Sequence, residues 1–302
     1  MSEARRSPRR SRREIDVQAG PTGLRLRVST WGEPSDRVTV LLHGFLEQGA
    51  AWHAVATRLQ GRVLAPDHRG HGLSEHVGRG GFYHFWDYVA DLDGLLDAMV
   101  GDRPVDLVGH SMGGTIASLF AASRPGRVRR LVLVEGLGPP DMSHARVAQA
   151  RRSLEHRRSP PLHRGLASVA EGALRMRTFN PSLDETTALE LATRTTRPAG
   201  LDDPDVDPAH PGPWVWTWDP LHRARAPRAF EAEAFGVFLD AIEAPTLAVD
   251  GGDSRFRPAD LAARVARLRD VRTLTIPEAG HLIHHDQPAA LAGAISAHLG
   301  AS

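Results

Sequence analysis

Short apolar runs alternate along the chain with longer segments whose apolar residues recur at helical spacing. Residues 37–44, "RVTVLLHG", form a continuous β-branched run, and the same character recurs at 62–67, 105–110, 130–136, 244–251 and 272–280. Helix-length amphipathic patterns fall at 50–60, 85–100, 113–125, 258–270 and 288–300. Continuous apolar strands are typical of a sheet that is covered on both faces. The alternation therefore predicts an α/β fold with a mostly parallel central sheet and helices on both faces.

Two regions depart from this rhythm. Residues 24–31 alternate with period two after the turn sequence "GPTG", which predicts one half of a β-hairpin. Residues 137–229 contain helix-like patches at 144–158, 166–177 and 186–194 but no clear strand pattern. A structureless loop of that length is improbable. We therefore predict a core domain formed by residues 15–136 and 230–302, with residues 137–229 as a helical insertion over one end of the sheet.

Composition narrows the classes of protein that are possible. The chain has 302 residues and no cysteine, which excludes disulfides, thiolate metal sites and cysteine nucleophiles and agrees with a cytoplasmic location. All 37 basic residues are Arg, and the net charge is only +1, so no global field favours nucleic acid. Six arginines open the chain, and residues 1–14 are predicted to be a disordered, solvated tail. No apolar segment of signal-peptide or membrane-spanning type follows, so no membrane partner is expected.

The stretch "VDLVGHSMGGTIASLF", residues 105–120, places one serine between a predicted strand and a predicted helix. Gly109 to Gly113 fit the pattern G-x-S-x-G. Glycines on both sides let strand and helix approach closely, while the sharp turn exposes the serine Oγ over the end of the sheet. The following helix N-terminus suits a developing negative charge. A glycine-rich turn with a capping serine is the alternative, but the strand–turn–helix context favours Ser111 as a nucleophile.

A serine nucleophile needs a base, which is normally a histidine held by a carboxylate. The chain has 16 histidines, so position in the fold must select among them. His281 directly follows the last predicted strand and is the candidate base, whereas His284 and His285 fall near the start of the next helix. A capping or core histidine is the alternative interpretation of His281.

The motifs together resemble the α/β-hydrolase superfamily, in its branch of esterases, haloperoxidase-like enzymes and C–C-bond hydrolases. They are "LLHGF" at 41–45, "APDHRGHGLSE" at 65–75, "GHSMGG" at 109–114 and "AGHLIHHDQP" at 279–288. The resemblance implies that the backbone N–H groups of Phe45 and Met112 form an oxyanion hole, and no cofactor is implied. The turn from Asp67 is interpreted as structural, packing against the oxyanion loop. A metal site at His68 and His71 is not expected, since no further ligand lies at suitable spacing.

The third member of the triad is ambiguous in the sequence. In the family, the acid usually follows the strand matching 244–251 in a G-x-x-D pattern, but three residues beyond Gly251 stands Ser254. A loop shifted by one residue would make Asp253 the acid, and we favour this solution. Some relatives carry the acid after the strand that follows the nucleophile helix, and here that position is Glu135. A carboxylate that ends a buried strand also needs a partner, which favours the same residue. Asp250 is the third candidate.

The insertion resembles the helical caps that choose the substrate in this family. Trp214, Trp216 and Trp218 alternate within it, which places three indoles on one side of an extended stretch and suggests an apolar or aromatic acyl pocket. Packing of the insertion onto the core is the alternative role for these rings. Met142 and Phe179 are further candidates for the pocket.

These expectations combine into a cofactor-independent serine hydrolase that acts on a small-molecule carboxylic ester. A C–C bond hydrolase of ring-cleavage products and a non-catalytic hydrolase-fold binding protein are the alternatives. The oligomeric state is left open.

Overall fold

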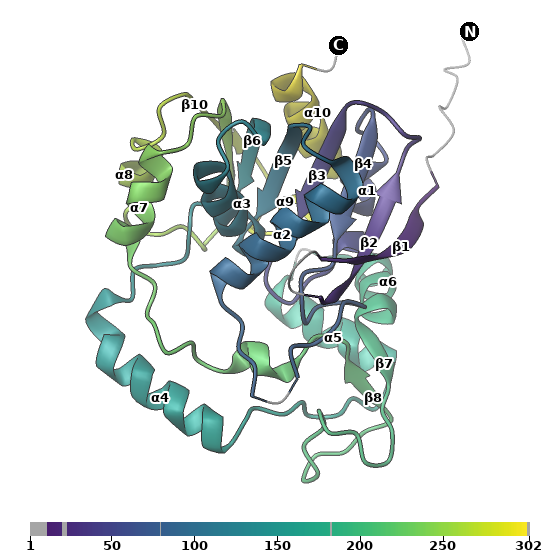
Figure 1. Cartoon of the computed structure of the whole chain (residues 1–302). Coiled ribbons are helices and arrows are strands. Elements are labelled where there is room, and N and C mark those ends of the chain that lie inside the picture. Colours follow the sequence, from purple (N-terminus) through teal and green to yellow (C-terminus); the bar gives the residue numbers. More distant parts are fainter. Residues whose placement is uncertain (1–10, 20–22, 79, 182, 301–302) are drawn as a thin grey trace, which may run out of the picture.

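The computed structural model describes residues 11–19, 23–78, 80–181 and 183–300, and within them it contains a single large sheet (Figure 1). Eight strands of the described chain follow one another across this sheet in the order β1 (Arg13–Gln18), β2 (Arg25–Trp31), β4 (Arg62–Pro66), β3 (Val38–Leu42), β5 (Val105–His110), β6 (Val128–Val134), β9 (Thr246–Gly251) and β10 (Val271–Ile276). β2 pairs antiparallel with β1 and β4, and every other neighbouring pair is parallel. The predicted α/β fold with a mostly parallel sheet is confirmed.

Helices cover both faces of the sheet, as the buried strands require. α2 (Phe85–Val100), α3 (Met112–Ser123) and α7 (Ala232–Asp240) contribute to one apolar cluster, and α2 and α3 lie in front of the sheet in Figure 1. α1 (His53–Ala56), α9 (Ile283–Asp286) and α10 (Pro288–Leu299) contribute to the other. Successive strand residues alternate between the two clusters: Leu107 of β5 faces the first, and Val108 faces the second.

Two predicted helices are shorter than their patterns. The pattern at 50–60 becomes a 3₁₀ turn, η2 (Gly49–Trp52), followed by the short α1, and the pattern at 258–270 becomes α8 (Leu261–Val265). Helix α7 was not anticipated.

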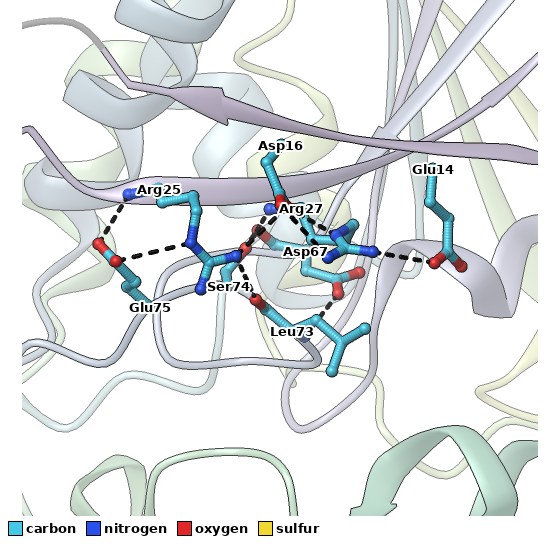
Figure 2. Close-up of polar contacts among 8 residues, drawn as sticks. All are labelled: Glu14, Asp16, Arg25, Arg27, Asp67, Leu73, Ser74 and Glu75. Carbon is cyan, nitrogen blue, oxygen red and sulfur yellow. Dashed lines mark hydrogen bonds and ion pairs between the residues drawn. The ribbon is translucent and has the colours of Figure 1, made fainter.

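The N-terminal strand corrects the predicted tail. Residues 1–10 lie outside the described residues, but β1 begins at Arg13, so the boundary at residue 14 is wrong. β1 and β2 form the predicted hairpin. Figure 2 shows that charged side chains reinforce it, because the Arg27 guanidinium lies 2.7 Å from Asp16 and 3.1 Å from Glu14. Polar residues after β4 continue this contact, since the backbone N–H of Arg27 donates to Ser74.

The segment between β6 and α7 contains an α-helix at each of the three places where a helix-like pattern was predicted, although more than half of its described residues lie outside helices. It contains η3 (Ser143–Ala145), α4 (Arg146–Arg158), α5 (Val169–Phe179), α6 (Glu185–Thr195), β7 (Thr196–Pro198), β8 (Trp214–Trp216) and η4 (Pro220–Arg223). The two-stranded pair β7–β8 was not predicted, because strands of three residues leave no periodic signal. In Figure 1 these elements lie below the sheet. Among the described residues, no helix has the length and apolar character needed to span a membrane.

Candidate active site

Ser111 stands on a strained turn between β5 and α3. Its backbone φ is 51° and its ψ is −114°, a combination that non-glycine residues rarely adopt. Two neighbouring glycines make the turn possible: a Cβ on Gly109 would lie 2.3 Å from the carbonyl oxygen of Gly113, and a Cβ on Gly113 would lie 2.4 Å from that of Leu42. The close approach that the G-x-S-x-G pattern predicted is therefore present, and the turn directs the serine away from the core.

His281 lies beside this serine. It follows β10 on a loop, and its Nε2 is 3.0 Å from Ser111 Oγ. The imidazole is 20% exposed, so it can exchange protons with a bound molecule while remaining packed. The ring of Phe256 covers it at a centroid distance of 4.6 Å. The structure thus brings together the two residues that the sequence singled out as nucleophile and base, which are 170 residues apart in the chain.

The carboxylate on the other side of the ring belongs to Glu135. Its Oε2 lies 3.1 Å from His281 Nδ1, and its Oε1 accepts a 2.8 Å hydrogen bond from the backbone N–H of Gly251. Glu135 directly follows β6 and has a positive φ of 50°, and its side chain is 1% exposed. Burial alone would raise its pKa, but the hydrogen bonds from His281, Ser254 and Gly251 outweigh burial and hold the pKa below its ordinary value.

The preference for Asp253 is therefore a wrong prediction of which carboxylate meets His281. Asp253 is exposed, and the hydrogen bond of its loop is made by its backbone N–H, which donates to Ala279 at 2.9 Å. Ser254, at the place of the expected acid, instead donates a 2.6 Å hydrogen bond to Glu135. Asp250 is half-buried in β9, and burial followed by repulsion from Glu135 raises its pKa. Sequence reasoning missed Ser254, although its place in the G-x-x-D pattern was visible.

The proposed oxyanion loop lies against the serine turn. β3 pairs with β5 so that Leu42 is opposite Gly109, which places the residues after each strand side by side. Among the described residues, the backbone N–H groups of Phe45 and Met112 have no protein acceptor, so both are available to a ligand. Leu46, which follows Phe45, has a positive φ of 62°. All four described non-glycine residues with positive φ lie on the loops of the candidate site, the fourth being Glu278, three residues before His281, and backbone strain of this kind concentrates at functional sites.

A buried histidine fixes the start of the oxyanion loop. Burial lowers the pKa of His43 to about 4, so the ring is neutral at ordinary pH. Its Nδ1 donates to the carbonyl of Gly44 at 2.7 Å, and its Nε2 accepts the backbone N–H of His68 at 2.9 Å. Asp67 supports the same loop by accepting the N–H of Gly49 at 2.7 Å. The interpretation of the turn after β4 as structural is consistent with these contacts.

One group of described residues has the spacing of metal ligands. Candidate ligand atoms of Glu47, His284 and His285 all lie within 4.8 Å of one another. The Glu47 carboxylate already accepts hydrogen bonds from His284, at 2.9 Å, and from the backbone N–H of Gly44, at 2.8 Å. We therefore treat this group as a hydrogen-bond network. His68 is not part of such a group among the described residues; it lies 4.2 Å from His43, ring to ring.

The three alternating tryptophans pack within the insertion. Trp214 and Trp216 pair with β7, and Trp218 is buried against Trp216 and His163, with ring centroids 6.4 and 4.2 Å apart. Among the described residues, no hydrogen bond or ring contact joins these indoles to Ser111 or His281, so their assignment to a substrate pocket stays a prediction. Phe179 is 88% exposed on α5 and does not line an enclosed pocket.

A cavity of about 390 Å³ lies where the insertion meets the core. Gln48 and Leu73 of the core line one side, while Arg194 and Thr217 of the insertion line the other. Ser111, His281 and Glu135 are not among its lining residues, so this cavity is separate from the candidate triad.

Comparison with known proteins shows the family of the chain. The model of the family described as "Alpha/beta hydrolase family" matches residues 39–294. A 3-hydroxybutyrate-oligomer hydrolase of Cupriavidus necator is 30% identical over 287 residues, which cover 90% of this chain and 92% of that protein. A serine hydrolase-like protein of Danio rerio is 36% identical over 115 residues, but the match spans only 35% of that protein's length.

Solved structures share the fold over nearly the whole chain. The thioesterase domain from the curacin biosynthetic pathway superposes with a TM-score of 0.81 and 33% sequence identity, covering 94% of this chain and 99% of that domain.

Proposed function

The chain belongs to the alpha/beta hydrolase family, and from that premise we propose that it is a serine hydrolase of carboxylic esters. The observation that carries the proposal is the continuous hydrogen-bonded line from Ser111 Oγ through His281 to the buried Glu135. Such a line supplies a nucleophile, a general base and a group that holds the base in the correct tautomer.

The geometry defines the proton path. Nδ1 of His281 faces a carboxylate that can only accept, so this nitrogen carries a proton and Nε2 is free to receive one from Ser111. In the proposed reaction, Ser111 Oγ bonds to the ester carbonyl carbon as its proton moves to Nε2. The alcohol leaves with that proton when the tetrahedral intermediate collapses. Water, deprotonated by the same nitrogen, then attacks the acyl-enzyme and releases the acid and free Ser111.

The negative charge of the intermediate needs fixed donors. We assign this role to the backbone N–H groups of Phe45 and Met112, which have no protein acceptor among the described residues. Removing one such donor typically slows an enzyme by about 10² to 10³-fold, so two of them form a substantial part of the catalysis. No cofactor is needed for these steps.

The similar proteins support an acyl bond as the target. The Cupriavidus necator relative is named for an oligomer of a hydroxy acid, and the curacin-pathway domain is named a thioesterase. Both names describe hydrolysis of an acyl group from oxygen or sulfur, which the proposed acyl-enzyme explains. The choice of acyl group is assigned to the insertion, which borders the site through His222 of η4, whose ring lies 6.1 Å from that of Phe45.

Hydrolysis of p-nitrophenyl esters from acetate to octanoate tests the proposal, with Ser111→Ala as the matched variant and a fluorophosphonate probe to label an activated serine. We expect turnover and labelling of the wild type, and loss of both in Ser111→Ala by about 10⁴-fold or more. Labelling without ester turnover would redirect the proposal to another bond, such as the C–C bond of a ring-cleavage product. A wild type that shows no labelling and no turnover would favour the alternative of a non-catalytic binding protein.

A further inference from the structure

Behind the triad, the side chain of Glu47 connects the proposed oxyanion loop with the serine turn. Its Oε2 accepts two hydrogen bonds, from the backbone N–H of Gly44 and from His110 Nδ1, each at 2.8 Å. Its Oε1 accepts a third from His284 Nε2 at 2.9 Å. Gly44 immediately precedes Phe45, and His110 immediately precedes Ser111. One carboxylate thus holds the residues adjacent to the two groups that must meet the same substrate carbonyl.

His110 extends the connection to the loop of the candidate base. Its Nε2 lies 2.9 Å from the backbone carbonyl oxygen of His281, and its side chain is 1% exposed. A carbonyl oxygen only accepts hydrogen bonds, and so does an ionised carboxylate. His110 therefore donates from both ring nitrogens, one to Glu47 and one to His281. Two side chains tie together the three loops that carry Phe45, Ser111 and His281.

The surroundings favour the ionised form of Glu47. Burial by itself would raise its pKa, but the contacts with His284 and His110 outweigh burial and hold the pKa well below its usual range. Burial lowers the pKa of His284 to about 3, so that ring is a neutral donor to the carboxylate. His110, which faces an acceptor oxygen at each ring nitrogen, is the histidine that pairs with Glu47, and Trp52 encloses the pair, with its ring 6.5 Å from His110 and 4.8 Å from His284.

Glu47 and His110 pack closely against the backbone of Gly44. A Cβ on Gly44 would lie 2.6 Å from Glu47 Oε2 and 2.7 Å from His110 Nδ1, so a glycine is required there. The oxyanion loop also contains the strained Leu46, which keeps its positive φ only if contacts on both sides enforce it. The Glu47 side chain, one residue further on, supplies such a contact by binding back to Gly44.

We propose that Glu47 is a positioning residue for the hydrolase reaction, holding the oxyanion loop, the serine turn and the histidine loop in register through its ion pair with His110. The inference rests on the proposed function, because it assigns Glu47 a part in that same chemistry. It acts through other groups and does not touch the substrate. Loss of the pair would move the oxyanion donors relative to Ser111, and displacements on the order of 1 Å cost about 10²-fold in rate.

The first variant is Glu47→Gln, which keeps the shape of the side chain but offers one acceptor oxygen where the carboxylate offers two. We expect kcat for a p-nitrophenyl ester to fall about 10 to 100-fold with KM changed less than about 3-fold, because positioning acts on the transition state. Fluorophosphonate labelling should slow by a similar factor. Glu171→Gln is the matched control: its carboxylate also accepts a backbone N–H, from Ala167 at 2.7 Å, but it lies on α5 of the insertion, and its kinetics should match the wild type.

A double-mutant cycle with His110→Asn separates positioning from general stability. If the two residues act as one unit, the double variant loses no more activity than the worse single variant. Nitrogen-15 NMR of the wild type should show protons on both ring nitrogens of His110, and Glu47→Gln should lose one. Wild-type kcat in a folded Glu47→Gln protein would overturn the inference, as would additive losses in the cycle. Glu47→Asp keeps the charge and serves if the glutamine variant fails to fold.

The two proposals fail in different ways. A wild-type protein that neither hydrolyses esters nor reacts with the fluorophosphonate contradicts the proposed function. An active wild type with an equally active Glu47→Gln contradicts the positioning role alone.

Discussion

The edge of the core where the parallel strands end, which carries the candidate triad, and the helical insertion differ in how many of their residues are buried. Helix α3, which starts at the serine turn, buries nine of its twelve residues, whereas α4 of the insertion buries one of thirteen, Ser153. Within the core, hydrogen bonds join the candidate triad from Ser111 through His281 to Glu135. The insertion instead exposes large apolar side chains, including Val147, Leu154 and Phe179, and its own described apolar cluster consists of four small or medium residues.

This difference separates two tasks. The core holds reacting atoms at fixed distances, which requires burial and satisfied hydrogen bonds on every side. The insertion has fewer buried contacts, so it can change its sequence or its arrangement at low energetic cost. We expect substitutions at the core edge to change the rate and substitutions in the insertion to change substrate preference or stability.

The largest effect in this comparison is expected for Glu135→Gln. The amide has one acceptor oxygen, whereas His281, Ser254 and Gly251 all donate to the present carboxylate. The histidine would be held in the wrong tautomer, which in a comparable serine enzyme lowers kcat by about 10⁴-fold. Asp253→Asn, on the exposed loop nearby, is the matched control and should keep wild-type kcat. A larger loss in Asp253→Asn would reverse the assignment of the acid.

Acid should destabilise the folded wild-type protein, because it protonates the carboxylate of Glu135. The pKa of Glu135 is held below its ordinary value of 4.5 in the folded protein, so the charge and its stabilising contacts are fully present above that value. They are lost as the pH falls through the lowered pKa. Thermal unfolding measured from pH 7 down to pH 3 should therefore show a steeper loss of stability for the wild type than for Glu135→Gln.

Ser254→Ala should have an intermediate effect. It removes one of three donors to Glu135 without touching His281, so kcat should fall about 3 to 10-fold, the range of one neutral or charge-assisted hydrogen bond. Steady-state kinetics on the ester series measure this, and Ser254→Thr, which keeps the hydroxyl, should retain most of the activity. Equal losses in both variants would mean that the size of the side chain matters and the hydrogen bond does not.

The smallest effect on rate is expected in the insertion. Trp218→Ala leaves a cavity beside Trp216 and His163 and should destabilise the protein by about 3 to 5 kcal/mol if its unfolding is cooperative. For the shortest esters, kcat should change less than about 3-fold, since no ring contact or hydrogen bond among the described residues joins this side chain to the triad. Differential scanning calorimetry and acetate-ester kinetics check the two parts. A large loss of kcat at unchanged stability would place Trp218 in the substrate pocket.

The spacing of apolar residues predicted the fold because each core strand and helix buries residues that recur regularly along its own sequence. It failed where structure depends on contacts remote in sequence. The strands β7 and β8 form because Trp214 pairs with Pro198 and Trp216 pairs with Thr196, and β1 begins as early as Arg13 because it pairs with the edge of β2. Neither feature leaves a period in the local sequence.

The serine and the histidine could be predicted because each is marked by a local pattern, a glycine turn for Ser111 and a strand end for His281. The acid could not, because the choice depends on how two loops meet. Glu135 follows β6 with a positive φ, yet its carboxylate meets His281 on the loop after β10, and Ser254 donates a hydrogen bond to it. The position of Asp253 in the sequence carried no information about this competition.

The positive φ angles of Leu46, Ser111 and Glu135 have a consequence for the evolution and engineering of this protein. Each such residue stores about 1 to 3 kcal/mol of backbone strain that a glycine would release. Selection for thermal robustness alone would therefore tend to remove side chains at these three turns. A variant selected only for thermal stability that carries glycine at one of these turns should unfold at a higher temperature and hydrolyse its substrate more slowly.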